Sequence, residues 1–204
     1  YPMHLFLIRA EVDGLVCSGV DKGKKPTYAL LDERVPPVKE LHREEALARL
    51  ATLYFQSHSP ATLADFIWWS GLTTTDARHA VGLIECDLLT EQYDSEIFYL
   101  HTSCDLKARC RQVLHLLPSY DEYLISYKDR TTVLLREHHP KAFNTFGIFY
   151  PVILHNGRII GNWKKAVKKK ALAPEVSFFN DVSDIPEELL KKAVDRYCYF
   201  YAKE

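Results

Sequence analysis

The sequence has no CxxC pair and no long apolar run. Its five cysteines in 204 residues are an odd number, whereas a disulfide framework normally uses an even number. The longest stretch without Asp, Glu, Lys or Arg covers residues 142–157 and includes Asn144 and Pro151, which is short of the ~20 apolar residues of a spanning helix. We therefore expect a reduced, cytoplasmic protein without a membrane segment.

Several kinds of active site are also missing. The eight glycines are dispersed at turns, so there is no glycine-rich phosphate loop. Ser70 and Ser126 lack the Gly-x-Ser-x-Gly context of a hydrolase nucleophile. His138 and His139 have no cysteine or histidine at ligand spacing, so we expect them in a surface loop. The sequence thus predicts no metal site and no cofactor.

The charge is unevenly distributed. The net charge is −1, yet no acidic residue lies between Glu137 and Glu175. This stretch is compatible with a polyanionic partner, although lysines also protect exposed strand edges. Its seven cations are Lys141, Arg158, Lys164, Lys165, Lys168, Lys169 and Lys170.

The N-terminal segment predicts part of a winged helix. Apolar residues at helical spacing indicate a helix over residues 1–13, and strands are expected at 15–18 and 27–31 around a glycine- and lysine-rich turn. A helix followed by such a hairpin is the back half of a winged helix, which we assign to residues 1–35. It would bury too little apolar surface to be stable alone. We therefore expect this segment either to pack on the rest of the chain or to be part of a longer protein. We favour the second interpretation.

Residues 38–102 predict a winged helix-turn-helix. Helices are expected over residues 43–56, 61–69 and 73–85, followed by a β-hairpin over 87–101. The expected starts of the second and third helices are an N-cap at Ser59–Pro60 and a capping box formed by Thr73 and Asp76.

The third helix could enter a DNA major groove. Arg78 is its basic residue, but Asp76 and Glu85 accompany it, and the hairpin tip is acidic as well. A structural or dimer-like packing role is therefore the alternative for this module. The basic turn containing Lys22, Lys24 and Lys25 is the better candidate for contact with DNA.

Residues 103–204 have a β character and predict a small barrel-like domain closed by a terminal helix. The fold class is therefore α+β. Asn156-Gly157 is the strongest turn signal in this part. Strands are expected over 113–117, 122–127, 131–135, 146–154, 158–164, 167–172 and 175–179, with helices over 106–111 and from Asp184 to Tyr201.

Three segments carry a family resemblance. PATLADFIWWSGL at residues 60–72, LLPSYDEYLISYKDR at 116–130 and PVILHNGRIIGNW at 151–163 resemble the AlkZ-like and YcaQ-like DNA glycosylases, which are winged helix DNA-binding domain proteins. The blocks occur in order and together cover about residues 40–170. The resemblance implies tandem winged helices and a C-terminal β-barrel that form a cleft for duplex DNA. It also implies excision of bulky alkylated or crosslinked bases by hydrolysis of the N-glycosidic bond, without a metal or nucleotide cofactor.

The sequence departs from this family at the catalytic motif. The family's signature is Gln-x-Gln in its N-terminal winged helix, whereas this chain has Gln56, Gln92 and Gln112, no two of which are separated by one residue. No catalytic residue is therefore assigned, and whether the chain is an enzyme stays open. In an intact protein the motif would precede Tyr1.

A carboxylate could replace the motif as the group that positions water and stabilises an oxocarbenium-like sugar. The nearest cluster is Asp121, Glu122 and Asp129. Asp121 follows Pro118-Ser119 and is more simply a turn residue that accepts a hydrogen bond from its own backbone.

Three hypotheses remain. The chain is the DNA-binding C-terminal portion of a DNA-repair glycosylase, or a non-enzymatic winged-helix DNA-binding protein, or a protein-interaction module. The first two have duplex DNA, intact or damaged, as partner, and the third would expose apolar side chains around Phe6, Trp68 or Tyr199. The residues expected to contact DNA are Lys22, Lys24, Lys25, Arg78, Arg130, Arg158, Lys164 and Lys165.

Overall fold

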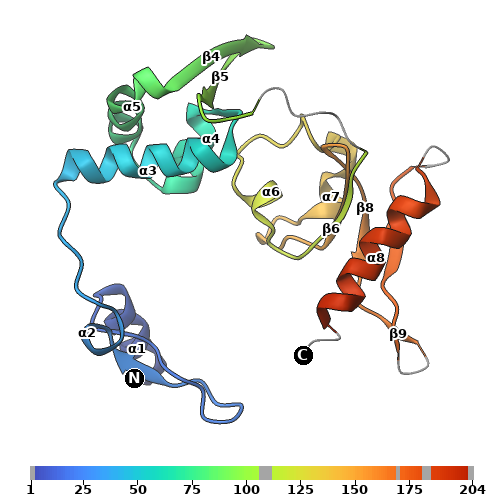
Figure 1. Ribbon diagram of the computed structural model, residues 1–204, viewed down its shortest axis with the longest axis horizontal. Helices are drawn as coiled ribbons and strands as arrows, with labels where there is room; N and C mark the ends of the chain where they lie inside the picture. The colour runs from blue at the N-terminus through green and yellow to red at the C-terminus, as the bar shows by residue number, and fades with distance from the viewer. Residues whose placement is uncertain (1–2, 106–111, 169–170, 181–184, 202–204) are drawn as a thin grey trace. The chain divides into compact units, whose positions relative to one another are not determined.

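The computed structural model shows a chain with mixed α and β structure in two compact units, Tyr1–His42 and Arg43–Glu204 (Figure 1). The structure describes residues 3–105, 112–168, 171–180 and 185–201. Within these ranges, no helix has both the length and the apolar character needed to cross a membrane.

The first unit contains a helix and a two-stranded antiparallel sheet. Helix α1, Met3–Val12, is followed by β1, Val16–Ser18, and β2, Tyr28–Leu30. Gly14 ends the helix region with a φ of +69°, a conformation that favours glycine. The helix and both strands are confirmed. Leu31 was expected to extend the second strand, but it starts a short helix, α2, Leu31–Arg34.

The described residues of the first unit form no buried core. None of residues 3–42 is buried. On α1, Met3 is 72%, Phe6 60% and Val12 77% exposed. Because a single helix and hairpin bury too little apolar surface for independent stability, we expect this unit to need a covering surface.

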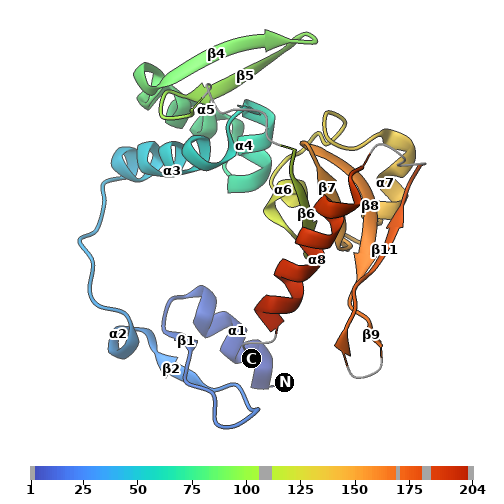
Figure 2. The ribbon, with the colours of Figure 1, turned by 45° about the vertical axis from the view of Figure 1, so that its right-hand side comes forward.

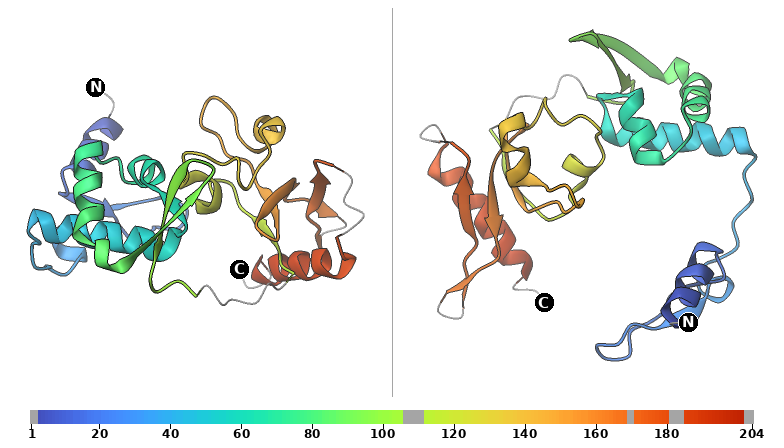
Figure 3. Two further views of the ribbon diagram at one scale, coloured as in Figure 1. Left: turned by 90° about the horizontal axis from the view of Figure 1, so that it is seen from above. Right: turned by 180° about the vertical axis from the view of Figure 1, so that it is seen from behind.

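The second unit begins with three helices and a hairpin. The hairpin turns at Asp94 and Ser95, whose φ values of 47° and 68° fit a two-residue type I′ turn. All four predicted elements are present, and the hairpin strands lie within the predicted range of residues 87–101. Figure 3 shows the hairpin projecting beyond the helices. The elements are α3 (Arg43–His58), β3 (Ala61–Thr62), α4 (Leu63–Ser70), α5 (Thr74–Leu83), a 3-10 turn (Glu85–Asp87), β4 (Leu88–Tyr93) and β5 (Glu96–His101), with the strands in the order β3-β5-β4.

The predicted cap of α4 was wrong. The N-cap is Thr62, whose side chain accepts a hydrogen bond from the Asp65 N–H while the Asp65 carboxylate accepts from Thr62 N–H, so the two residues form a capping box. Ser59 is not available for this role, because its hydroxyl donates to the Phe55 carbonyl at 2.6 Å and accepts from His101 N–H at 2.9 Å. Thr73 is confirmed as the N-cap of α5, because its side chain accepts from Asp76 N–H, but the Asp76 carboxylate accepts from the Thr73 hydroxyl and does not complete a capping box.

The rest of the second unit is built on a four-stranded antiparallel sheet with the order β11-β8-β7-β6. The predicted turn at Asn156-Gly157 joins β7 to β8 and is confirmed. The elements are β6 (Leu114–Leu117), α6 (Glu122–Ile125), a 3-10 turn (Arg136–His138), α7 (His139–Ala142), β7 (Val152–His155), β8 (Arg158–Lys164), β9 (Val167–Lys168), β10 (Ala171–Leu172), β11 (Glu175–Phe178) and α8 (Glu187–Tyr201).

Two predicted strands were wrong. Residues 122–127 begin as helix α6, because the Asp121 carboxylate accepts from Tyr123 N–H at 3.0 Å and caps it. Residues 131–135 form turns, in which Leu134 N–H donates to the Arg130 carbonyl at 2.9 Å. Apolar alternation suggested strands here, but local hydrogen bonds close the chain into turns instead.

The expected barrel is not found. Over the described ranges the four-stranded sheet stays open, with β11 and β6 at its edges. Strands β9 and β10 pair with each other and do not continue this sheet. Of the strand expected over 146–154, the C-terminal part forms β7. The helix expected over 106–111 and the cap at Asp184 lie outside the described residues.

The sheet has an apolar layer on each face. Ile153 and Trp163 pack with Ala193 of α8, whereas Val152 and Leu154 contribute to the core on the other side. Figure 2 shows α8 lying along the sheet. Gly161 lies where β8 pairs with β11, and a Cβ atom there would be 2.4 Å from the Ser177 carbonyl oxygen. This close approach requires glycine.

The helical part and the sheet part of the second unit are joined by direct hydrogen bonds. Asp65 is 4% exposed, and its Oδ1 accepts from Lys128 N–H at 2.8 Å while its Oδ2 accepts from the Thr62 backbone and hydroxyl at 2.9 and 2.7 Å. Trp68 Nε1–H donates to the Ile125 carbonyl at 2.8 Å. One carboxylate therefore caps a helix and holds the next segment against it.

Replacing Asp65 with Ala is expected to lower the free energy of unfolding by about 3 kcal/mol, since three buried donors lose their acceptor. Urea unfolding followed by circular dichroism measures this loss. Asp195→Ala, at an exposed position of α8, is the matched control, with an expected change below about 0.5 kcal/mol. Equal losses for the two variants would contradict the role of Asp65.

Candidate nucleic-acid interface

The basic turn of the first unit presents three exposed lysines. Lys22 and Lys25 are joined by reciprocal backbone hydrogen bonds of 3.0 and 3.2 Å, and Gly23 lies between them with a φ of +66°. Lys22, Lys24 and Lys25 are all exposed. The short backbone closure therefore holds three cations close together, without an acidic residue between Lys22 and Lys25.

On helix α5, Arg78 is exposed, and its neighbours on the helix are already paired. Asp76 Oδ1 accepts from Arg43 at 2.7 Å, and His79 Nε2 lies 3.2 Å from Glu44 Oε1. The hydrogen bond from Arg43 lowers the pKa of the Asp76 carboxyl from its usual value. Arg78 borders a shallow cleft with Glu85, so this surface carries both signs of charge.

Arg130 is half-buried in the second unit, where its guanidinium lies among aromatic rings. Its guanidinium carbon lies 5.3 Å from the ring centroid of Phe143, 5.2 Å from that of Phe149 and 5.7 Å from that of Trp68. Its Nε–H donates to the Leu124 carbonyl at 2.5 Å. Burial lowers the pKa of Arg130 from its usual value. These contacts favour a packing role over the phosphate contact expected from the sequence.

Lys164 and Lys165 follow one another at the end of β8, and both side chains have partners within the chain. Lys164 Nζ lies 2.9 Å from Glu175 Oε2, and this pairing raises the pKa of the lysine from its usual value. Lys165 Nζ lies 3.8 Å from the ring centroid of Tyr201. Because the ion pair and the cation–π contact are exposed and weak, both ammonium groups remain available to a stronger anion.

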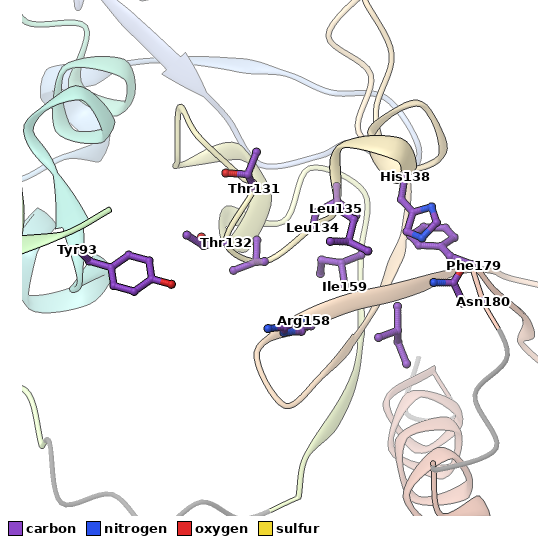
Figure 4. Close-up of a pocket in the computed structure, with 12 residues that line it drawn as sticks. Tyr93, Thr131, Thr132, Leu134, Leu135, His138, Arg158, Ile159, Phe179 and Asn180 are labelled. Atoms are coloured by element: carbon purple, nitrogen blue, oxygen red, sulfur yellow. The ribbon is translucent and has the colours of Figure 1, made fainter. Parts of the chain in front are cut away.

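Arg158 begins β8, directly after the Asn-Gly turn, and its side chain is exposed. It lines a cleft of about 430 Å³ together with residues 131–135, His138, Phe179 and Asn180. In Figure 4 Arg158 and Tyr93 lie toward one end of this cleft, and His138 and Asn180 lie toward the other.

Sequence reasoning missed most of this cleft. Thr131 and Thr132 were placed in a strand, and His138 was expected in a surface loop. In the structure His138 is 6% exposed, with its ring centroid 4.8 Å from that of Phe179. The one available signal was the lack of acidic residues after Glu137, which marked the region as basic without indicating its shape.

The carboxylates considered as catalytic groups are engaged in local structure. Asp121 caps α6, and Asp129 Oδ1 accepts from Thr131 N–H at 2.7 Å, a hydrogen bond that lowers the pKa of the Asp129 carboxyl. Glu122 accepts a hydrogen bond from Ser126, and its Oε2 lies 3.6 Å from His58 Nε2. Across the described part of the chain, no group of three or more His, Cys, Asp or Glu residues is arranged to hold a metal ion.

Arg130→Ala is expected to lower the free energy of unfolding by about 3 kcal/mol, through loss of three cation–π contacts and buried packing. Urea unfolding measures this loss, with the exposed Arg49→Ala as control. The folded fraction of Arg130→Ala is expected to bind duplex DNA with an affinity within about twofold of the wild type. If Arg130 contacted a phosphate, its loss would weaken binding by more than this. A stable variant with weakened DNA binding would reverse this assignment.

Comparisons with known proteins agree over most of the chain. Residues 4–200 match the model of the family described as DNA glycosylase AlkZ-like. The interstrand DNA cross-link repair glycosylase of Streptomyces sahachiroi is 24% identical over 189 residues, which are 88% of this chain and 50% of that protein.

The solved structure of the DNA glycosylase AlkZ from Streptomyces sahachiroi has a TM-score of 0.76 with this chain at 23% identity. The similarity covers 91% of this chain and 52% of that structure. It shows a shared mixed α and β fold. This chain thus spans about half the length of the curated relative that it matches.

Proposed function

The chain belongs to the AlkZ-like DNA glycosylase family, and we propose that it is the DNA-binding portion of a repair glycosylase that acts on alkylated or crosslinked bases. The family match over residues 4–200 is the observation that carries this proposal. The relative from Streptomyces sahachiroi is named for interstrand DNA cross-link repair. Because the chain spans about half of that protein, the activity of the whole protein is part of the proposal.

Within this proposal, residues 38–102 form a winged helix-turn-helix. Three successive helices and a tightly turned hairpin support it, with α5 as the helix that would approach a groove and β4–β5 as the wing. Residues 1–35 would be the back half of another winged helix, and residues 103–204 a third domain. A helix followed by a hairpin supports the first two of these modules.

The proposed contacts with DNA are electrostatic. The three exposed lysines of the basic turn are the main group, because nothing acidic separates them. Arg78 and Arg158 add single exposed cations, and Lys164 and Lys165 would exchange weak internal partners for phosphates. Arg130 is not included, because its guanidinium packs between aromatic rings.

Catalysis is proposed to depend on groups outside this sequence. Hydrolysis of an N-glycosidic bond needs a group that positions water and stabilises a cationic sugar. No two of the glutamines Gln56, Gln92 and Gln112 are separated by one residue, so none of them belongs to a Gln-x-Gln motif. The candidate carboxylates Asp121 and Asp129 accept backbone hydrogen bonds. The chain would therefore hold DNA and release no base.

The variant Lys24→Ala/Lys25→Ala is expected to bind duplex DNA about fivefold to tenfold more weakly than the wild type at 100 mM salt. The slope of log affinity against log salt concentration should become shallower by about 1.5 to 2, as for the loss of two phosphate contacts. Fluorescence anisotropy over a salt series measures both quantities, and the preference for sequence should not change.

The control for this pair is Lys191→Ala/Lys192→Ala on α8, which removes the same charge elsewhere. An unchanged affinity of the Lys24/Lys25 variant at low salt would reject the basic turn as a DNA contact. Wild-type protein that binds no DNA at any salt concentration, but binds another protein, would favour the interaction-module hypothesis.

When the chain is incubated with crosslinked or alkylated duplex DNA, we expect it to bind the duplex and release no base above the uncatalysed rate. Mass spectrometry of the released bases measures this, and the glycosylase from Streptomyces sahachiroi on a crosslinked duplex serves as the positive control. Base release by this chain alone would show that its own residues catalyse the hydrolysis.

A further inference from the structure

The cleft beside β8 has the size of a small-ligand site. Its volume of about 430 Å³ lies within the range of roughly 300–1,000 Å³ typical of such sites. One wall is formed by the turns of residues 131–135 and by His138, and the other by the first residues of β8 and by Phe179 and Asn180. Figure 4 shows Leu134, Leu135 and Ile159 between the two ends.

The two ends of the cleft carry different polar groups. At one end are the exposed guanidinium of Arg158 and the hydroxyls of Thr131 and Thr132. At the other are the Asn180 amide and the His138 imidazole, which can donate and accept hydrogen bonds. The cleft therefore offers a cation with hydroxyls on one side and neutral hydrogen-bonding groups on the other.

His138 has an unused hydrogen-bonding atom. Its Nε2 is buried and makes no hydrogen bond with the described residues. Glu137 Oε1 lies 3.4 Å from this atom, without the geometry of a hydrogen bond. A buried polar atom without a hydrogen-bond partner costs free energy, so rotation of the His138 ring toward a ligand that supplies a partner would gain affinity.

The charge at the Arg158 end of the cleft suits an anionic group, whereas the Glu137 carboxylate lies beside His138 at the other end. None of the described residues that line it is acidic. Lys141 Nζ lies 5.2 Å from the ring centroid of Phe179 and adds a positive charge near the His138 end. The apolar floor of leucine and isoleucine side chains fits a flat, weakly polar ring better than a second charged group.

We infer that this cleft binds one unpaired nucleotide of DNA. The base lies over the apolar floor, with its edge at His138 and Asn180, and the phosphate lies at Arg158, Thr131 and Thr132. This inference rests on the proposed DNA-binding function and adds that the chain distinguishes an unpaired nucleotide from a paired duplex. In this inference Arg158 has a specific role, which is to bind the phosphate of the nucleotide in the cleft, besides its general contribution to the positive surface charge.

The test compares three fluorescein-labelled duplexes of one sequence by anisotropy with the full chain. One is fully paired, one has a single-nucleotide bulge, and one has the same bulge without its base. We expect the wild type to bind the bulge with a base about fivefold to tenfold more tightly than the bulge without one. Asn180→Ala and His138→Gln are each expected to reduce this ratio to about twofold or less.

Arg158→Ala should weaken binding of both bulged duplexes by a similar factor of about threefold to fivefold, because this variant would lose the contact with the phosphate and keep the contacts with the base. Gln56→Ala and Arg49→Ala, at exposed positions of α3, are the controls for loss of an amide and of a guanidinium. Circular dichroism verifies that each variant is folded. Asn180 and Arg158 are exposed, so these two variants are expected to fold even where His138→Gln does not.

The outcomes separate this inference from the proposed function. Equal affinity for the two bulges, with binding of the paired duplex retained, overturns the inference and leaves the proposed function standing. Absence of DNA binding by the wild type refutes both. If Asn180→Ala and folded His138→Gln still prefer the bulge with a base, other residues determine this preference, and the inference is also overturned. If a free deoxynucleoside monophosphate competes for binding and the chain shows no preference for the bulge, the ligand of the cleft is a free nucleotide and the inference of a strand-bound nucleotide is overturned.

Discussion

The buried carboxylate of Asp65 is the interaction on which the second unit depends. One oxygen completes the capping box that starts α4, and the other accepts from the backbone of Lys128. The segment that Asp65 holds leads directly into Arg130 and into the turns that form one wall of the cleft. A buried charge is stable here because it is surrounded by donors. The same residue therefore fixes a helix end and the position of a candidate binding surface.

Local signals in the sequence predicted most elements of the fold. Apolar spacing located α3, the Thr73 and Asp76 pair located α5, and Asn156-Gly157 located the turn between β7 and β8. The family resemblance from three short blocks is confirmed by the match over residues 4–200. These features share one property, which is that the residues that determine them are close together in the chain.

Some errors occurred where distant residues decide, and others where a local hydrogen bond overrides the apolar alternation. Ser59 and Thr62 are both suitable caps, and Ser59 is excluded because its hydroxyl bonds to Phe55 and His101. Tyr123 and Ile125 alternate as in a strand, yet Asp121 caps a helix there. Closure of a sheet into a barrel depends on pairing between its first and last strands, which no local pattern specifies.

The candidate interface shows the same limit. The sequence identified the basic residues, and the structure gives each one its surroundings. Lys24 is exposed, Lys164 is paired with Glu175, and Arg130 lies among aromatic rings that come from distant segments. His138 became a candidate residue through its burial beside Phe179. Neither the partner of a cation nor the burial of a histidine can be inferred from composition.

The close pairing of β8 with β11 has a consequence for how this protein can diverge. At Gly161 the neighbouring strand leaves room for a hydrogen atom and not for a methyl group. Any descendant that changes this residue must separate the two strands or shift their register, and a shift by one residue would turn every side chain of β11 to the opposite face. Glycine at position 161 is therefore a marker of this sheet among related proteins. A relative with a larger residue at this position must arrange the strand that corresponds to β11 differently.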